Sequence, residues 1–246
     1  MSQKTQQTIH IVATSHGTDN PHGQQLIHDL RGDLERMSAQ QFPGQLLWHE
    51  AYVDVQEPRL ESVIAALPEG EPAVVLPLLV SDGVHTTDDI AQAVASRPGT
   101  LAAPPLGPLP ELAQVLAQRA AGHLEKDTLV IVAAAGTRLE VGQNQVENLA
   151  EQVAGLLERE VLVGYCAGAQ PRIAELVGGA AGRPVLVLSA LLADGYFQQK
   201  LASTGADVVT SPLLPDVMIT QCFLVRLQKA LQEGLFMSPD DELLTR

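Results

Sequence analysis

Residues 8–18, with the sequence TIHIVATSHGT, begin the pattern that decides the fold. Residues 8–15 are apolar and β-rich and end at His16-Gly17, and a helical pattern follows from Pro21. Apolar residues recur there at helical spacing, namely Leu26, Leu30, Leu34 and Met37. Asp19 or Asn20 can cap this helix, and Pro21 suits its first turn. The stretch therefore predicts a strand followed by a helix.

The alternation of strand and helix continues to residue 124. We expect further strands at 46–55, 73–80 and 101–103, and further helices at 58–67, from about residue 87, and at 111–124. The run 73–80 is apolar throughout, which is typical of a strand covered on both faces. The β-α-β-α order predicts a parallel sheet with right-handed crossovers. We expect Ala, Val and Leu to fill its core, because 46% of the residues are hydrophobic but only 3% are aromatic.

The second half of the chain echoes the first. Four segments recur in the same order: 129–137 echoes 11–18, 164–173 echoes 51–60, 184–195 echoes 73–83, and 211–215 echoes 104–108. The offsets are 119, 113, 112 and 107, and they shrink as the loops shorten. We therefore predict two tandem α/β domains of one ancestry, each with a mainly parallel sheet flanked by helices. They span residues 1–124 and 125–246, with a short tail after Gly234 outside the repeat.

The chain is acidic, with 15 Lys and Arg against 29 Asp and Glu and a formal charge of −14. Nucleic acids and anionic membranes require a basic surface, so we expect neither as a partner. Acidity suits a cation as cargo, although it is also a general means of solubility. No apolar run reaches ~18 residues and the first residues are polar, so we expect a cytoplasmic protein. Cys166 and Cys222 lack metal-type spacing and are expected to be buried, reduced thiols.

All seven histidines precede residue 125. His16 follows the first expected strand and His85 follows the third. Ligands of open α/β sheets bind at the carboxyl ends of strands, so these two side chains can face one cleft. The matching residues of the second repeat are Ala135 and Phe197. A histidine needed for folding should occur in both repeats, so the asymmetry favours a functional role over a loop histidine that only hydrogen-bonds the backbone.

The other histidines carry weaker signals. We expect His10 to be a satisfied core or edge residue, and His28 to face solvent because it lies off the apolar stripe. His22 is placed to approach the cleft. His49 and His123 show nothing that separates them from surface residues.

Two imidazoles without cysteine suit a divalent ion such as Fe²⁺, Co²⁺, Ni²⁺ or Zn²⁺. A carboxylate would complete such a site. Asp54, at the end of the second expected strand, is the best placed, although it can also be an ordinary turn residue. Asp88 and Asp89 are explained more simply by a favourable interaction with a helix N-terminus.

Small residues beside the two histidines would let a ligand approach the backbone closely, at Gly17-Thr18 and at Gly83. The chain has no G-x-G-x-x-G, Walker or G-x-S-x-G motif. Nucleotide binding and α/β-hydrolase chemistry therefore lack support.

Four motifs resemble the class II tetrapyrrole chelatases, the sirohydrochlorin ferrochelatase and cobaltochelatase family. Residues 15–18 (SHGT) after a strand are similar to that family's Gly-His-Gly-Ser. Residues 51–54 (AYVD) before Glu57-Pro58 are similar to its Ala-Phe-Leu-Glu before Glu-Pro. Residues 83–90 (GVHTTDDI) are similar to its Gly-Gly-His-Val-Arg-Glu-Asp-Ile, and residues 105–108 to its Pro-Leu-Gly-Pro. The likeness covers most of 8–124 and, more faintly, 125–234.

The resemblance implies insertion of Fe²⁺ or Co²⁺ into sirohydrochlorin, for sirohaem or cobalamin synthesis, in a cleft between two α/β domains. A ferrochelatase is favoured over a cobaltochelatase. His16 and His85 match the two active-site histidines and are the implied catalytic residues. They would bind the metal together with Asp54, which stands where the family has Glu. The implied ligand contacts are Ser15, Gly17, Thr18 and Gly83, and no cofactor is implied beyond the substrate metal.

The chain departs from the family pattern at Asp19 and Thr87, where the family has Arg. The sequence also leaves open a non-catalytic metal or tetrapyrrole carrier with the same site, and an assembly or regulatory domain that has lost its chemistry. Because a covalent duplication already supplies both walls of a cleft, we expect a monomer.

Overall fold

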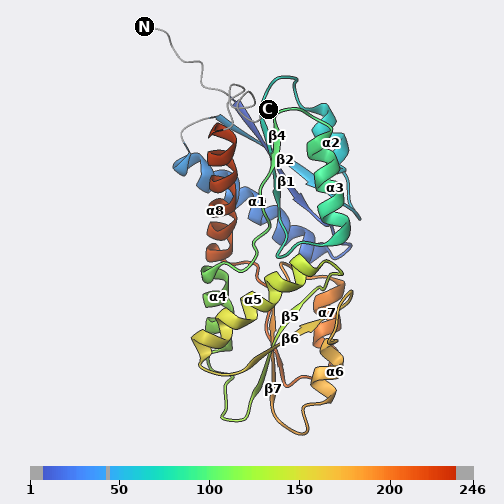
Figure 1. Cartoon of the computed structure of the whole chain (residues 1–246), viewed down its shortest axis with the longest axis vertical. Coiled ribbons are helices and arrows are strands. Elements are labelled where there is room, and N and C mark those ends of the chain that lie inside the picture. Colours follow the sequence, from blue (N-terminus) through green and yellow to red (C-terminus); the bar gives the residue numbers. More distant parts are fainter. Residues whose placement is uncertain (1–7, 43–44, 237–246) are drawn as a thin grey trace, which may run out of the picture.

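The computed structural model describes residues 8–42 and 45–236, which form two α/β halves stacked end to end (Figure 1). The strands of the first half are β1 (Thr8–Ser15), β2 (Gln45–Tyr52), β3 (Ala73–Pro77) and β4 (Thr100–Ala102), and its helices are α1 (Pro21–Gln41), α2 (Leu60–Ala66), α3 (Val84–Ala95) and α4 (Pro110–Ala120). The strands of the second half are β5 (Leu129–Ala134), β6 (Val161–Tyr165), β7 (Val185–Ser189) and β8 (Val208–Val209), and its helices are α5 (Glu140–Leu157), α6 (Ile173–Gly178), α7 (Tyr196–Ala202) and α8 (Val217–Phe236).

Each half contains one four-stranded parallel sheet. The strand orders are β2-β1-β3-β4 and β6-β5-β7-β8, so the first strand of each half is central and the chain crosses over helices to add the others. Helices cover both faces of each sheet (Figure 1). This arrangement confirms the predicted α/β class. None of the helices in the described ranges is long and apolar enough to cross a membrane.

Helix α1 forms as the sequence predicts. The side chain of Asn20 accepts a hydrogen bond from the Gly23 amide at 2.9 Å, which satisfies one of the free donors of the first turn. Leu26, Leu30 and Leu34 are buried against the sheet. The helix therefore begins at a polar cap and is held by its apolar stripe.

Several element boundaries differ from those expected, among them α4, which ends at Ala120 instead of residue 124. β2 ends at Tyr52, although the amides of Val53 and Asp54 still bond the carbonyls of Ser15 and His16 at the end of β1. β3 ends at Pro77, which has no backbone amide to donate, although the Leu78 amide still bonds the Thr14 carbonyl of β1 at 2.7 Å. α3 begins at Val84 rather than near residue 87, because the Thr87 amide already bonds the Gly83 carbonyl at 2.8 Å. His85 therefore lies in the first turn of a helix and not in the expected loop.

The internal repeat extends to the register of the sheets. Val12 pairs with His49 in the first sheet, and Ile131 pairs with Leu162 in the second, at the offsets of 119 and 113 found in the sequence. The loops agree as well. The Tyr52 amide bonds the Pro58 carbonyl at 2.9 Å, and the equivalent Tyr165 amide bonds the Pro171 carbonyl at 3.0 Å.

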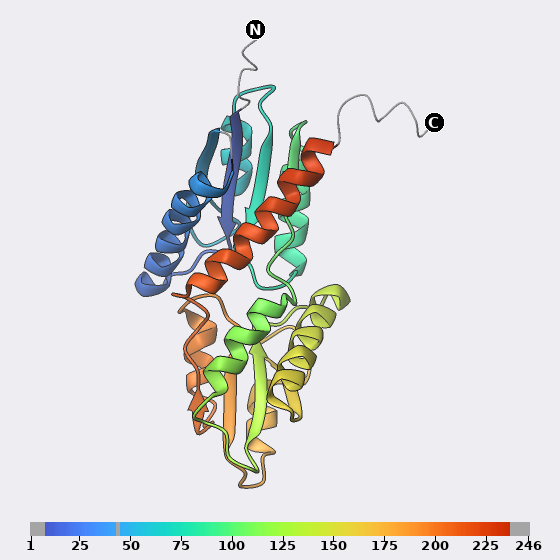
Figure 2. The ribbon, with the colours of Figure 1, turned by 90° about the vertical axis from the view of Figure 1, so that its left-hand side faces the viewer.

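The last helix of each half packs on the other half. α4 contacts α5 and β7, whereas α8 contacts α1, β3 and β4. Figure 2 shows α8 lying across the first sheet and α4 lying in the second half. Each sheet therefore has one face covered by a helix that its own segment of sequence does not supply, and a division of the chain at residue 125 would separate both helices from the sheets they cover.

Two arginines fasten the exchanged helices. Arg119 in α4 donates through Nη2 to the Leu213 carbonyl at 2.7 Å. Arg226 in α8 donates through Nε to the Leu106 carbonyl at 2.9 Å. Both carbonyls belong to the proline-rich segments that echo at an offset of 107, and the two arginines are separated by the same offset. The packing of the last helix on the other half therefore recurs in both repeats.

Candidate functional site

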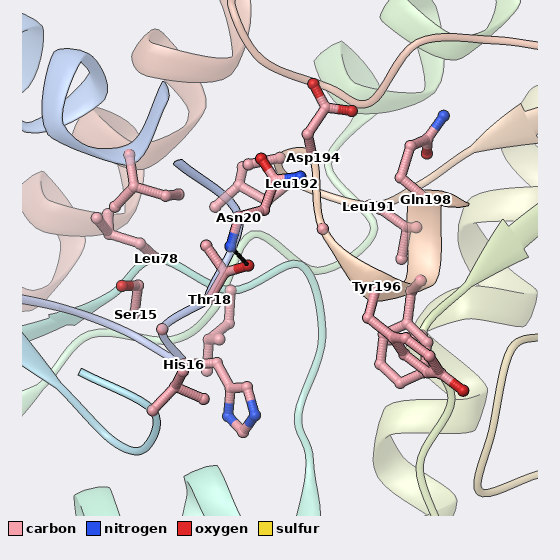
Figure 3. A pocket seen from close by; sticks show the side chains of 18 of the residues that line it. Ser15, His16, Thr18, Asn20, Leu78, Leu191, Leu192, Asp194, Tyr196 and Gln198 are labelled. Atoms are coloured by element: carbon pink, nitrogen blue, oxygen red, sulfur yellow. Dashed lines mark hydrogen bonds between the residues drawn. The ribbon is translucent and has the colours of Figure 1, made fainter. Parts of the chain in front are cut away.

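The halves meet at a cleft of about 760 Å³ between the carboxyl ends of their strands. Residues from both halves line it, namely segments 15–21, 55–56 and 78–81 with Ile27 in the first half, and segments 134–135 and 190–199 in the second. Figure 3 shows His16, Ser15 and Thr18 on one wall and Tyr196 and Gln198 on the opposite one. The cleft therefore stands where open α/β sheets bind ligands, at the ends of their strands.

Two glycines let the halves approach. A Cβ added to Gly23 in α1 would lie 2.0 Å from the Asp194 carbonyl oxygen, and one added to Gly142 in α5 would lie 2.2 Å from the Asp82 carbonyl oxygen. These contacts are equivalent in the two repeats, so each helix N-terminus meets a strand-end loop of the other half. Any larger residue at either glycine would force the cleft walls apart.

Polar pairs join the halves at the same two contacts. The Asp82 amide donates to Gln145 Oε1 at 2.9 Å, and Gln145 Nε2 donates to Asp82 Oδ2 at 2.7 Å. At the other contact His22 Nδ1 lies 2.7 Å from Asp194 Oδ2, and Asp194 lines the cleft. His22 therefore reaches the cleft region as a pairing residue between the halves.

His16 follows β1 and is exposed on the cleft wall. Its backbone carbonyl accepts the Asp54 amide at 3.0 Å, which fixes the two residues on adjacent loops. Gly17 has a φ of 91°, and a Cβ there would lie 2.6 Å from the Asp54 carbonyl oxygen, so this close approach requires glycine. Ser15, at the end of β1, is buried, and its Oγ has no hydrogen-bond partner among the described residues.

Asp54 follows β2 and holds its carboxylate outside the residues that line the cleft. Oδ1 accepts a hydrogen bond from Arg59 Nη1 at 3.2 Å, and 62% of the side chain is exposed. A hydrogen bond from the Val55 backbone lowers the pKa of Asp54, and Arg59 lowers it further, with His16 adding a smaller electrostatic contribution. The carboxylate is therefore charged at neutral pH and electrostatically coupled to His16.

The backbone of His85 lies in the first turn of α3, directly after Val84 and the N-cap residue Gly83. Its side chain lies outside the part of the chain that the structure describes. Within the described residues, no three His, Cys, Asp or Glu side chains are grouped closely enough to hold a metal ion. The set of His16, His85 and Asp54 therefore stays a prediction, of which the structure brings His16 and Asp54 together.

The opposite wall of the cleft has two adjacent aromatic rings, whose contact the sequence pattern does not reveal. Tyr196 and Phe197 begin α7, with ring centroids 5.5 Å apart, and both line the cleft. Tyr196 is 73% exposed, although only 3% of the residues in the chain are aromatic. Phe197 is the second residue of α7, as His85 is of α3, so the repeat replaces a histidine with an apolar ring.

A second group of titratable residues lies away from the cleft. His10 is buried in β1, with Nδ1 2.8 Å from His49 Nε2 and Nε2 2.6 Å from Glu71 Oε2. This confirms the prediction that His10 is a satisfied core residue. His49 has a partner that the sequence pattern does not reveal, because β1 and β2 come together only in the fold. The two cysteines are free and buried, and burial raises the pKa of each to about 11.

Several solved structures share this fold. SirB from Bacillus subtilis with Fe³⁺ has a TM-score of 0.70 at 19% identity, over 92% of this chain and 98% of that one. The sirohydrochlorin chelatase SirB from Bacillus subtilis subspecies spizizenii, in complex with cobalt, has a TM-score of 0.70 at 18% identity, over 94% and 98%. CbiX, described as the terminal enzyme for biosynthesis of sirohaem in denitrifying bacteria, has a TM-score of 0.60 at 19% identity, over 89% and 99%. No curated protein sequence matches the chain.

The fold is thus that of the two-domain SirB chelatases. Residues 10–122 match the model of the CbiX family. The matched segment contains His16, Asp54 and His85. The family resemblance in the sequence is therefore confirmed.

Proposed function

We propose that this protein inserts Fe²⁺ or Co²⁺ into sirohydrochlorin, as a step of sirohaem or cobalamin synthesis, with iron placed ahead of cobalt. The observation that carries the proposal is the position of His16, exposed at the end of β1 on the wall of a two-sided cleft and coupled to the charged Asp54. The match of residues 10–122 to the CbiX family model supports the same reaction. The solved SirB structures with Fe³⁺ and with cobalt are consistent with either metal.

The reaction requires a base as well as a metal ligand. Two pyrrole N–H protons must leave the macrocycle as the divalent metal enters, so the net step exchanges two protons for one M²⁺. A neutral imidazole, with an ordinary pKa of ~6.5, can hold the metal or accept a proton at cellular pH. We assign metal delivery and proton removal jointly to His16 and His85.

Asp54 has a different part in this scheme. Its exposed carboxylate, kept charged by the Val55 amide and Arg59, would attract the hydrated cation to the first-half side of the cleft. Ser15, Gly17, Thr18 and Gly83 would shape the surface against which the macrocycle rests. The apolar residues of the cleft, including Leu78, Leu191 and the Tyr196 ring, suit the flat faces of a tetrapyrrole.

The test is an anaerobic insertion assay with purified protein, sirohydrochlorin and either Fe²⁺ or Co²⁺, followed by the absorbance of the macrocycle. We expect many turnovers per protein molecule and a rate above the uncatalysed background. A single turnover with no release would indicate a metal or tetrapyrrole carrier, and no acceleration with either metal would refute the proposal. The metal with the higher kcat/KM identifies the preferred ion.

A further inference from the structure

The strand-end loops of the two halves share one backbone and carry opposite charges. Asp19 follows Gly17-Thr18 in the first half, and Arg138 follows Gly136-Thr137 at the equivalent position in the second. The equivalence is structural, because the Asn20 amide bonds Thr18 Oγ1 at 3.2 Å and the Leu139 amide bonds Thr137 Oγ1 at 3.1 Å. An acidic residue of one repeat is thus a basic residue of the other.

The same reversal occurs in the helices after β3 and β7. α3 begins at Val84 and contains Asp88 in its first turns, whereas α7 begins at Tyr196 and contains Lys200 at the same position. Both charged side chains belong to exposed residues. Lys200 Nζ donates to the Cys166 carbonyl at 2.6 Å, at the end of β6.

The third difference concerns an arginine that both repeats contain. Arg59 donates to the Val53 carbonyl at 2.9 Å and pairs with the carboxylates of Asp54 and Glu57. Arg172 occupies the same position, since the bridge between Tyr52 and Arg59 recurs between Tyr165 and Arg172.

The partners of Arg172 are missing from the second repeat. Ala167 and Gln170 stand where Asp54 and Glu57 stand, and the carbonyl of Cys166 is taken by Lys200. Within the described residues the Arg172 guanidinium forms no ion pair. The charge that the first repeat neutralises is therefore available in the second.

The three basic residues belong to adjacent segments of the second half: Arg138 to the loop after β5, Arg172 to the N-cap of α6, and Lys200 to α7. They are not among the residues that line the cleft, but Arg138 and Lys200 are close in sequence to the lining residues Ala135 and Gln199. A Cβ added to Gly168 would lie 3.1 Å from the Thr137 amide nitrogen, so the loop that leads to Arg172 packs on the loop that contains Arg138. The hydrogen bond from Lys200 to Cys166 ties α7 to that same loop. Three acidic residues are also nearby: Asp194 is paired with His22, Glu140 begins α5, and Glu175 accepts a hydrogen bond from the Arg172 backbone amide at 3.2 Å. We name Arg138, Arg172 and Lys200 the basic rim.

We propose that the basic rim binds carboxylate groups of the substrate and thereby orients it across the cleft toward His16. The inference rests on the proposed function, in which the substrate is a tetrapyrrole with many carboxylates. A chain with a formal charge of −14 repels such a polyanion, so local cations must offset the repulsion. Arginine is suited to this because its guanidinium can bind a carboxylate through two parallel hydrogen bonds.

In this proposal the two repeats bind ligands of opposite charge. The first repeat presents Asp19 and Asp54 at its strand ends and Asp88 in the first turns of α3, and these carboxylates attract a metal cation. The second repeat presents the basic rim, which attracts the anionic macrocycle. Cation and anion therefore approach the cleft from different walls and do not compete for the same residues.

The test measures binding of metal-free sirohydrochlorin by anaerobic fluorescence titration to the full-length protein and its Arg138→Gln, Arg172→Gln and double variants. A hydrogen bond to a charged group contributes about 1.5 kcal/mol or more, so we expect each substitution to weaken binding roughly tenfold. The effect should shrink as salt is added. Lys229→Gln, which removes the same charge from the exposed face of α8, is the matched control and should change the affinity less than twofold.

Separate readouts distinguish the possible failures. The affinity for Co²⁺ alone should be unchanged in all three rim variants. The melting temperature should be unchanged as well, because neither guanidinium has an ion-pair partner among the described residues, and the hydrogen bond of Arg172 to Glu175 uses the backbone amide. The wild type could insert metal while the double variant binds sirohydrochlorin as tightly as the wild type does. This result would overturn the proposed role of the basic rim and leave the proposed function standing. Wild-type protein that binds no sirohydrochlorin would overturn both.

Discussion

The two halves of the molecule have the same backbone and different chemistry. The first has His16 and Asp54 on adjacent loops, and the second has Ala135 and Ala167 joined by an equivalent hydrogen bond of 2.9 Å. A backbone that keeps its turns after losing its polar side chains shows that those side chains were not required for folding. The comparison therefore separates residues that build the strand ends from residues that act there.

The largest effect is expected from separating the halves. Residues 1–124 alone would lack α8, which covers α1, β3 and β4, and would expose the face of α4 that packs on α5 and β7. Exposed apolar surface of this kind favours association. We expect the fragment to be insoluble or to pair with itself, as gel filtration and circular dichroism would show.

Co-expression of residues 1–124 with residues 125–246 is the matched control for this experiment, because it returns both exchanged helices to the sheets they cover. We expect a folded complex of the two fragments. A monomeric, stably folded fragment 1–124 would contradict the view that each sheet depends on the other half's helix.

The next effect concerns the histidines present only in the first half. Replacing His16 or His85 with Ala should lower kcat at least 100-fold, the lower range for loss of a general base. The double variant should be little worse than either single one, because residues that act as a unit are not additive. Melting temperatures should barely change, which circular dichroism would check. A single variant near the wild-type rate would remove that histidine from the mechanism.

The reciprocal experiment places histidines in the second half, with the double substitution Ala135→His and Phe197→His. We expect at most a weak metal site, because Ala167 stands at the position of Asp54 and provides no carboxylate. Isothermal titration with Co²⁺ would count the sites. A second tight site that survives loss of His16 and His85 would show that both walls can carry the metal chemistry.

The arginines of the exchanged helices should differ in their effect on stability. Arg119 bonds the carbonyls of Ser211 and Leu213 and also Asp216, whereas Arg226 bonds the carbonyl of Leu106. We expect Arg119→Met to reduce the free energy of unfolding by about 2 kcal/mol, and Arg226→Met to reduce it by less. Urea denaturation would measure both. Equal losses would mean that the number of bonded carbonyls does not decide the stability of the exchange.

A smaller effect is expected from Asp54, which lies beside the cleft rather than among the residues that line it. As a carboxylate that gathers cations, it should act on the apparent affinity for metal. Asp54→Ala should therefore raise the KM for metal by more than it lowers kcat, in an assay with varied Fe²⁺ or Co²⁺. An unchanged KM would indicate that Asp54 is a turn residue held by Arg59 and does not gather metal.

The sequence predicts those features of the fold that depend on local patterns. The apolar run of β1, the cap at Asn20 and the order of strands and helices all follow from short-range spacing. The exchange of α4 and α8 does not follow from such spacing. An amphipathic pattern predicts that a helix covers a sheet, but it does not indicate which sheet. The offset shared by Arg119 and Arg226 was the available signal, since arginines of two packed helices recur with the proline-rich segments they bind.

The candidate site is predictable to a similar extent. Periodicity places His16 and Asp54 at strand ends, and parallel strands bring those ends together. The pairing of Asp54 with Arg59 and of His22 with Asp194 depends on side-chain directions that the pattern does not contain. The start of α3 was missed because Thr86 and Thr87 are weak helix formers, while the hydrogen bond from Thr87 to Gly83 decides the boundary.

The smallest effect concerns a titratable group in the first half that the second half lacks. His10 and His49 contact each other in the first sheet, and the equivalent residues of the second sheet are Leu129 and Leu162. Burial lowers the pKa of His49, and the adjacent His10 lowers it further. Between this lowered pKa and the ordinary value of 6.5, the unfolded chain binds more protons than the folded one.

The contribution of His49 to stability is therefore fully present above pH 6.5 and is lost as the pH falls through that range toward the folded-state pKa. We expect His49→Gln, which does not titrate, to lose less stability than the wild type between pH 7.5 and pH 5.5 in urea denaturation. His28→Gln, on the exposed face of α1, is the matched control and should leave the pH dependence unchanged. If His49→Gln follows the wild-type profile, the pH dependence of stability arises elsewhere in the chain, and the pair of His10 and His49 is only a packing difference between the two sheets.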